Sequence, residues 1–137
     1  MRIITGAARG KKLQSLEGER VRPTPDRVKE ALFNIIQFDL EGRRVLDLFA
    51  GSGQLGLEAL SRGAQEAVFV DSSRDSAGVV ERNIAATGFG ERAKVVNADF
   101  ASFLSRNPQP FDIAFLDPPY RTGLLQQALP QTAAVKI

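Results

Sequence analysis

The chain has 137 residues, of which 43% are hydrophobic and 25% are charged, and its formal net charge is +2. This size and composition are typical of one soluble domain, and we expect a cytoplasmic protein because the sequence has neither a signal peptide nor an apolar run near the roughly 18 residues of a membrane span. Cysteine and histidine are absent, which excludes disulfides, thiolate nucleophiles, histidine triads and the usual zinc ligands, so we expect neither a metal site nor covalent attack on a pyrimidine ring.

The first 22 residues are predicted to form a basic extension. They hold six Lys or Arg against two Glu, a net charge of +4, so the rest of the chain carries −2. From residue 2 the pattern indicates two short strands around a glycine-containing turn, a β-hairpin. Concentrated positive charge favours contacts with nucleic-acid phosphates, for which the candidates are Arg2, Arg9, Lys11, Lys12 and Arg22. The charge alone fits a solvated basic hairpin equally well.

A helix is predicted to follow and to run to about Gln37. Thr24 is a suitable N-cap, Pro25 fits the first helical position, and Asp26 favours the positive end of the helix dipole. One face of this helix should pack on the domain, since apolar residues recur at helical spacing: Val28, Leu32, Ile35 and Ile36.

From residue 43 the sequence alternates predicted strands and helices, which indicates a mainly parallel sheet with helices on both faces. We place strands at 45–48, 67–70, 94–96 and 111–116, and helices at 55–61, 74–86 and 100–104. The expected fold class is therefore α/β and Rossmann-like, with residues 1–22 as the N-terminal hairpin extension and residues 23–137 as the main domain. Because nucleotide-binding sheets of this kind usually have more strands, C-terminal strands are expected to be missing.

A glycine-rich turn joins the first predicted strand to the next helix, in the sequence Asp-Leu-Phe-Ala-Gly-Ser-Gly-Gln-Leu-Gly. Glycines permit positive φ and close approach of a ligand, and the helix that follows offers unpaired N–H groups. The candidate cofactor-binding residues of this turn are Phe49, Gly51, Ser52 and Gly53. NAD-dependent oxidoreductases use a similar glycine pattern to hold pyrophosphate.

Aspartates stand at the carboxyl ends of the first three strands, the edge at which open α/β sheets bind ligands. Asp47 would repel pyrophosphate but suits an ammonium and a sulfonium, which favours S-adenosylmethionine over NAD. Asp71 suits ribose hydroxyls, while Asp99 suits the adenine amino group, with Phe100 against the ring. Structural roles remain open for two of them, Asp47 as a loop cap and Asp99 as a helix N-cap.

The fourth predicted strand ends in Asp117-Pro118-Pro119-Tyr120, which we predict to be the catalytic site. The prolines fix the backbone, so the Asp117 carboxylate and the Pro118 carbonyl can hold both N–H bonds of an exocyclic base amine and align its lone pair with a methyl carbon. Asp117 can then take the surplus proton, and Tyr120 can stack on the target base. The structural alternative is a tight Pro-Pro turn with a surface aromatic.

These motifs together resemble the bacterial 16S rRNA guanine-N2 methyltransferase family. Besides the glycine turn and residues 117–120, the resemblance rests on residues 1–6, 9–10, 22–24 and 26–34, and it covers nearly the whole chain. It implies that the first three strand ends and Thr24 surround S-adenosylmethionine, and that residues 117–120 receive a guanine of small-subunit rRNA, in free RNA or in a ribosomal assembly particle. Asp71 stands where the family usually has glutamate, and the family's last strands are absent.

Other functions remain open from the sequence. The residues at 117–120 fit an adenine amine as well as a guanine amine, so a DNA adenine-N6 methyltransferase is the first alternative. The short C-terminal part is compatible with a non-catalytic fragment that binds nucleic acid or the cofactor. An NAD-dependent oxidoreductase would account for Gly51, Gly53 and Gly56, but for neither Asp47 nor residues 117–120.

Overall fold

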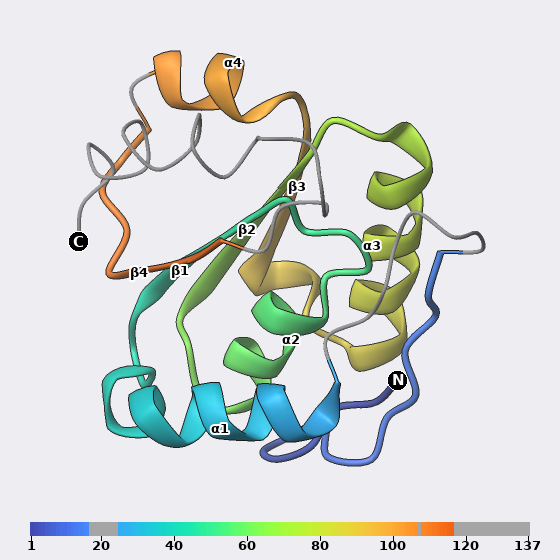
Figure 1. Cartoon of the computed structure of the whole chain (residues 1–137), viewed down its shortest axis with the longest axis vertical. Helices are drawn as coiled ribbons and strands as arrows, with labels where there is room; N and C mark the ends of the chain where they lie inside the picture. Colours follow the sequence, from blue (N-terminus) through green and yellow to red (C-terminus); the bar gives the residue numbers. More distant parts are fainter. Residues whose placement is uncertain (17–24, 107, 117–137) are drawn as a thin grey trace.

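The computed structural model describes residues 1–16, 25–106 and 108–116. Within these ranges the chain forms a four-stranded sheet flanked by helices (Figure 1). The strands are β1 (Arg44–Leu48), β2 (Glu66–Asp71), β3 (Ala93–Asn97) and β4 (Ile113–Leu116). The α-helices are α1 (Asp26–Ile36), α2 (Gln54–Ser61), α3 (Arg74–Thr87) and α4 (Phe100–Ser105), and the 3₁₀ helices are η1 (Gln37–Asp39) and η2 (Gly90–Arg92).

The sheet is parallel throughout and has the strand order β3-β2-β1-β4. The chain therefore builds outward from β1 to β3 and then returns to the other side of β1 to form β4. Open α/β sheets bind ligands at such a reversal, outside the carboxyl ends of the strands. The topology thus places the expected site beside the carboxyl ends of β1 and β4.

Alternating side chains of the strands face two separate apolar cores. Val45 and Phe69 belong to the core under α1, α2 and α3, whereas Leu46 and Val68 belong to the core under α4. Figure 1 shows α4 on the opposite side of the sheet from α1 and α2. The predicted parallel sheet with helices on both faces is therefore confirmed, and each predicted strand overlaps an observed one.

The helix ends follow local rules of capping. α3 begins at an N-cap, Ser73, whose side chain accepts a hydrogen bond from the backbone N–H of Ser76, and it ends at Gly88 with φ 79°. α1 begins at Asp26, one residue later than expected, because Pro25 has an extended backbone and stands outside the first turn. No helix in the described ranges combines the length and apolarity of a bilayer span.

The N-terminal hairpin is shorter than predicted. In place of two strands, residues 1–16 form one antiparallel bridge, between Arg2 and Lys12. The reason is that the backbone N–H groups of Ile4 and Thr5 donate to the Glu58 carboxylate on α2, at 2.8 and 3.0 Å, and so are bonded to a helix instead of an opposing strand. The extension is thereby tied to the main sheet through α2.

Candidate functional site

The glycine-rich turn between β1 and α2 has an unusual backbone. Phe49 has φ 64°, and it is the one non-glycine residue with positive φ in the described part of the chain. Gly51 and Gly53 follow with φ 60° and 84°. An aromatic residue held in this region costs roughly 1–3 kcal/mol, and such strain concentrates at ligand sites. The backbone strain therefore makes the turn a candidate site, while the contacts of its residues with a cofactor stay a prediction.

Asp71, the last residue of β2, holds the turn from the side. Its Oδ2 accepts a hydrogen bond from Gly51 N at 2.8 Å, and its Oδ1 accepts one from Ser73 N at 2.9 Å. Each carboxylate oxygen can accept two hydrogen bonds, so both keep acceptor capacity for a ligand hydroxyl. This arrangement is compatible with the predicted ribose contact, which remains a prediction.

Asp47 lies beneath the turn, 2% exposed. Its Oδ2 accepts a hydrogen bond from the backbone N–H of Gly56 at 3.0 Å, so the carboxylate fixes the first turn of α2. This hydrogen bond is similar to the loop-capping role that the sequence left open for Asp47. Its position in β1 also puts it at the strand end next to the glycine turn, where the predicted ammonium contact would require it.

Gly56 explains why α2 can approach the sheet so closely. A Cβ built on Gly56 would lie 2.3 Å from Cε1 of Phe69, a core residue of β2. A side chain at this position would push α2 away from the sheet. The third glycine of the pattern is therefore needed for the close packing of α2 on β2.

Asp99 acts as the N-cap of α4. Its Oδ1 accepts a hydrogen bond from Ser102 N at 2.8 Å, and this bond holds the pKa of the exposed Asp99 carboxyl below its usual value. Phe100 is 8% exposed and belongs to the α4 core, with its ring centroid 5.4 Å from that of Phe49. The N-cap alternative is thus observed, while the adenine contacts of both residues stay predictions.

Asn83, which the sequence analysis did not single out, ties three segments together. It is 1% exposed, and its Nδ2 donates to the carbonyl oxygens of Ser52 and Gln14, each at 2.9 Å, while its Oδ1 accepts from Gln14 N. It thereby connects the glycine turn, α3 and the N-terminal extension. The signal in the sequence was an amide among the apolar positions of α3, beside Val79, Val80 and Ile84.

Gln54, the first residue of α2, has a buried side-chain oxygen that no described residue satisfies. The residue is 6% exposed, and Oε1 has no hydrogen-bond partner among the described residues. Native proteins rarely leave such an atom unpaired, so it suggests a ligand contact at the turn. An acceptor at this turn can receive a hydrogen bond from an N–H or O–H group of a ligand.

A buried ion pair lies beneath the N-terminal extension, and it too was not predicted from the sequence. Lys29 of α1 and Glu58 of α2 are both fully buried, with Nζ 3.4 Å from Oε1. Arg62 adds a second cation, its Nε 2.9 Å from Glu58 Oε2. Burial lowers the pKa of the Lys29 ammonium, an effect that Glu58 opposes.

The predicted phosphate-binding side chains of the extension are accessible. Arg2, Arg9, Lys11 and Lys12 are all exposed. Arg2 is partly neutralised by Asp26, at 3.8 Å from Nε to Oδ2. The remaining predicted site residues lie outside the described ranges: Arg22, Thr24, Asp117, Pro118, Pro119 and Tyr120.

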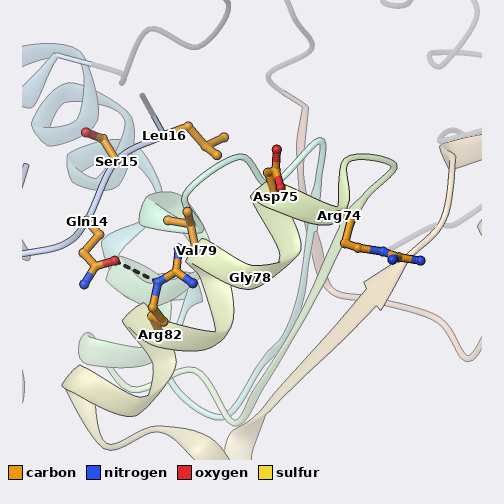
Figure 2. Close-up of a pocket in the computed structure, with 8 residues that line it drawn as sticks. All are labelled: Gln14, Ser15, Leu16, Arg74, Asp75, Gly78, Val79 and Arg82. Atoms are coloured by element: carbon orange, nitrogen blue, oxygen red, sulfur yellow. Dashed lines mark hydrogen bonds between the residues drawn. The ribbon is translucent and has the colours of Figure 1, made fainter. Parts of the chain in front are cut away.

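A separate hollow of about 520 Å³ lies between the extension and α3 (Figure 2). Arg82 turns toward Gln14, and its Nε donates to Gln14 Oε1 at 2.9 Å, whereas Arg74 extends away from both. None of the predicted cofactor residues lines this hollow. Its lining residues are Gln14, Ser15, Leu16, Arg74, Asp75, Gly78, Val79 and Arg82. Because its lining includes none of the predicted cofactor residues, we place the candidate site at the glycine turn instead. The described residues contain no cluster of acidic side chains that could hold a metal ion.

Comparison with known proteins gives consistent matches along the chain. The model of the family described as "Conserved hypothetical protein 95" matches residues 1–136. The "Ribosomal RNA small subunit methyltransferase D" of Escherichia coli K12 is 43% identical over 94% of this chain. The Haemophilus influenzae protein of the same name is 42% identical, and the match covers 94% of this chain and 68% of the relative.

The match covers 65% of the Escherichia coli relative, so the chain spans just under two thirds of that protein. A solved structure of an Escherichia coli protein is similar with a TM-score of 0.87 and 40% identity, over 99% of this chain and 73% of the other. The fold and the order of its elements are thus shared with larger proteins.

Proposed function

Because this chain belongs to the family described as Conserved hypothetical protein 95, we propose that it is an S-adenosylmethionine-dependent methyltransferase that acts on small-subunit ribosomal RNA. The names of its relatives supply the substrate class. The finer part of the proposal is that the methyl group goes to the exocyclic N2 amine of a guanine. This part is supported by the resemblance and by residues 117–120 of the sequence. A cytoplasmic location would follow from such a substrate.

The cofactor proposal is carried by one observation, the strained glycine turn held between two carboxylates at the reversal of strand order. Asp47 lies in β1 and Asp71 ends β2, and both bond to backbone N–H groups around the turn. Two fixed carboxylates would repel a pyrophosphate but would attract an ammonium and accept from ribose hydroxyls. This supports S-adenosylmethionine over NAD.

We assign the contacts of the cofactor as follows. Asp47 would hold the ammonium, Asp71 the ribose and Asp99 the adenine amino group. Phe49, which is half-buried at the turn, is better placed than the buried Phe100 to offer its ring to a ligand. The other contacts in the proposal are Thr24, Gly51, Ser52 and Gly53.

When bound, S-adenosylmethionine supplies an electrophilic methyl group on its sulfonium. In the proposal, Asp117 and the Pro118 carbonyl accept the two N–H bonds of the target amine, which orients its lone pair. Asp117 then takes the proton that the methylated amine gives up. Tyr120 stacks on the base, and Pro119 keeps the loop rigid.

The proposed RNA surface includes the exposed cations of the extension. Arg9, Lys11 and Lys12 are exposed and have no ion pair within the part of the chain that the structure describes. Free cations contact phosphates at the lowest cost, because no existing pair must be broken. Arg2 and Arg22 complete the proposed set.

Transfer of a labelled methyl group from S-adenosylmethionine to small-subunit rRNA tests the proposal, using both naked rRNA and subunits from cells without this modification. Asp117→Asn should lower the turnover about a hundredfold or more, since it removes the proton acceptor. Asp39→Asn is the matched control, because Asp39 is exposed in η1. Equal transfer by wild type and Asp117→Asn would contradict the proposed mechanism.

A further inference from the structure

Gln54 has a buried polar atom to which no residue of the described ranges donates a hydrogen bond. Its Oε1 has no hydrogen-bond partner among the described residues, and the residue is 6% exposed. A buried carbonyl oxygen without a partner destabilises a protein, and a donor from a bound ligand is one way in which a native site removes this cost. The ligand group must be a hydrogen-bond donor, because Oε1 is an acceptor only.

The position of Gln54 places this acceptor at the candidate site. It directly follows Gly53, the left-handed N-cap of α2, which as a glycine has no side chain with which to cap the helix. Residues four apart in a helix share a face, so Gln54 stands one turn from Glu58, on the side of α2 that meets Lys29 and the extension. The acceptor is therefore at the turn, on the side of α2 toward α1.

We propose that Gln54 Oε1 accepts an N–H from the α-ammonium of S-adenosylmethionine, an inference that rests on the proposed function. The cofactor has other donors, but the ribose and the adenine are assigned to Asp71 and Asp99, which follow β2 and β3. The ammonium is then the donor left for the end of β1, where α2 begins. Asp47 supplies the charge for this ammonium, and Gln54 supplies a second, directional acceptor.

The role is one of positioning the cofactor. An ammonium held by a carboxylate alone can rotate, whereas two acceptors in different directions fix the methionine part and thereby the methyl group. Gln54 contacts no reacting atom in this proposal. Loss of the Gln54 acceptor should weaken the binding of ligands that carry the amino-acid part. It should leave the binding of ligands without this part unaffected.

The affinities of two ligands, measured by calorimetry, test this inference without an assay of methyl transfer. S-adenosylhomocysteine carries the ammonium, and 5′-methylthioadenosine has the same adenine and ribose without the amino-acid part. Methionine is close in shape to glutamine and lacks the acceptor. Gln54→Met should lower the affinity for S-adenosylhomocysteine about ten- to a hundredfold and the affinity for methylthioadenosine less than about twofold. The melting temperature without ligand should be unchanged or higher, because an unpaired buried oxygen is removed.

Gln65→Met is the matched control, since Gln65 is exposed at the amino-terminal side of β2, and it should change neither affinity. An unchanged affinity of Gln54→Met for S-adenosylhomocysteine, or an equal loss of both ligands, would overturn the inference. If the wild type binds neither ligand, the proposed function itself fails. The two failures are therefore distinguishable.

Discussion

At the scale of single residues, the candidate site depends on close contacts between α2 and the sheet, where a larger side chain would not fit. Gly56 allows α2 to approach β2, since a Cβ there would lie 2.3 Å from the Phe69 ring. Asp47 fixes the same helix turn through the Gly56 N–H. The aspartate and glycine positions could be predicted from the sequence because the motif has a characteristic spacing. Their division into packing and ligand roles could not, since it depends on which atoms meet in three dimensions.

Gly56→Ala should destabilise the protein by about 1–3 kcal/mol, because the new methyl group overlaps the Phe69 ring. Phe69→Leu in the same chain should recover at least about 0.5 kcal/mol of this loss in a double-mutant cycle measured by urea unfolding. Gly78→Ala is the control: its Cβ would meet only Arg82 Nη1, at 3.6 Å. That change should stabilise α3 by about 0.5–1 kcal/mol. A Gly56→Ala variant as stable as wild type would contradict the packing role.

At the scale of elements, the strands and their order of appearance followed from the pattern of apolar residues. The interior of the hairpin did not, since the backbone N–H groups of Ile4 and Ala8 donate to side chains of α2, whereas the bonds between the two arms involve the residues nearer their ends. A buried Lys29–Glu58 pair is equally invisible in a sequence, because each residue has the ordinary appearance of an exposed helix position. Both features depend on contacts between residues that are far apart in the sequence.

Glu58→Ala should cost about 3–5 kcal/mol, since it leaves the Lys29 ammonium buried without its carboxylate. It also removes the acceptor of two backbone N–H groups, so the amides of Ile4 and Thr5 should exchange with solvent much faster than in wild type. Urea unfolding and amide hydrogen exchange measure the two effects. Glu81→Ala, an exposed position of α3, should change stability by less than about 0.5 kcal/mol. Unchanged exchange at Ile4 and Thr5 would contradict the tie between the extension and α2.

The lowered pKa of Lys29 predicts a dependence of stability on pH. Because burial lowers this pKa in the folded state, the unfolded chain binds more protons between the lowered pKa and the ordinary value of 10.5. The contribution of Lys29 to the free energy of unfolding should therefore rise with pH across this window and be complete above 10.5. Lys29→Met should lack this rise, while its Glu58 keeps Arg62 as a partner. Parallel pH profiles of wild type and variant would contradict the assignment.

At the scale of the whole molecule, the parallel order β3-β2-β1-β4 gathers residues that are distant in the sequence. The turn after β1 and the end of β2 meet through the bond from Gly51 N to Asp71 Oδ2. The meeting of strand ends could be predicted from the alternation of strands and helices, since consecutive parallel strands end at one edge. The unpaired oxygen of Gln54 could not, because it depends on burial. The candidate site thus combines carboxylates that the sequence predicts with the Gln54 oxygen, whose burial only the structure shows.

The most direct test of the proposed function is the identity of the methylated nucleoside. The protein would be incubated with labelled S-adenosylmethionine and unmodified small ribosomal subunits, and the rRNA would be digested to nucleosides for mass spectrometry. The account predicts label in N2-methylguanosine. Label in N6-methyladenine of DNA, offered in a parallel incubation, would support the alternative target, and binding of the cofactor without transfer to any RNA would contradict the account.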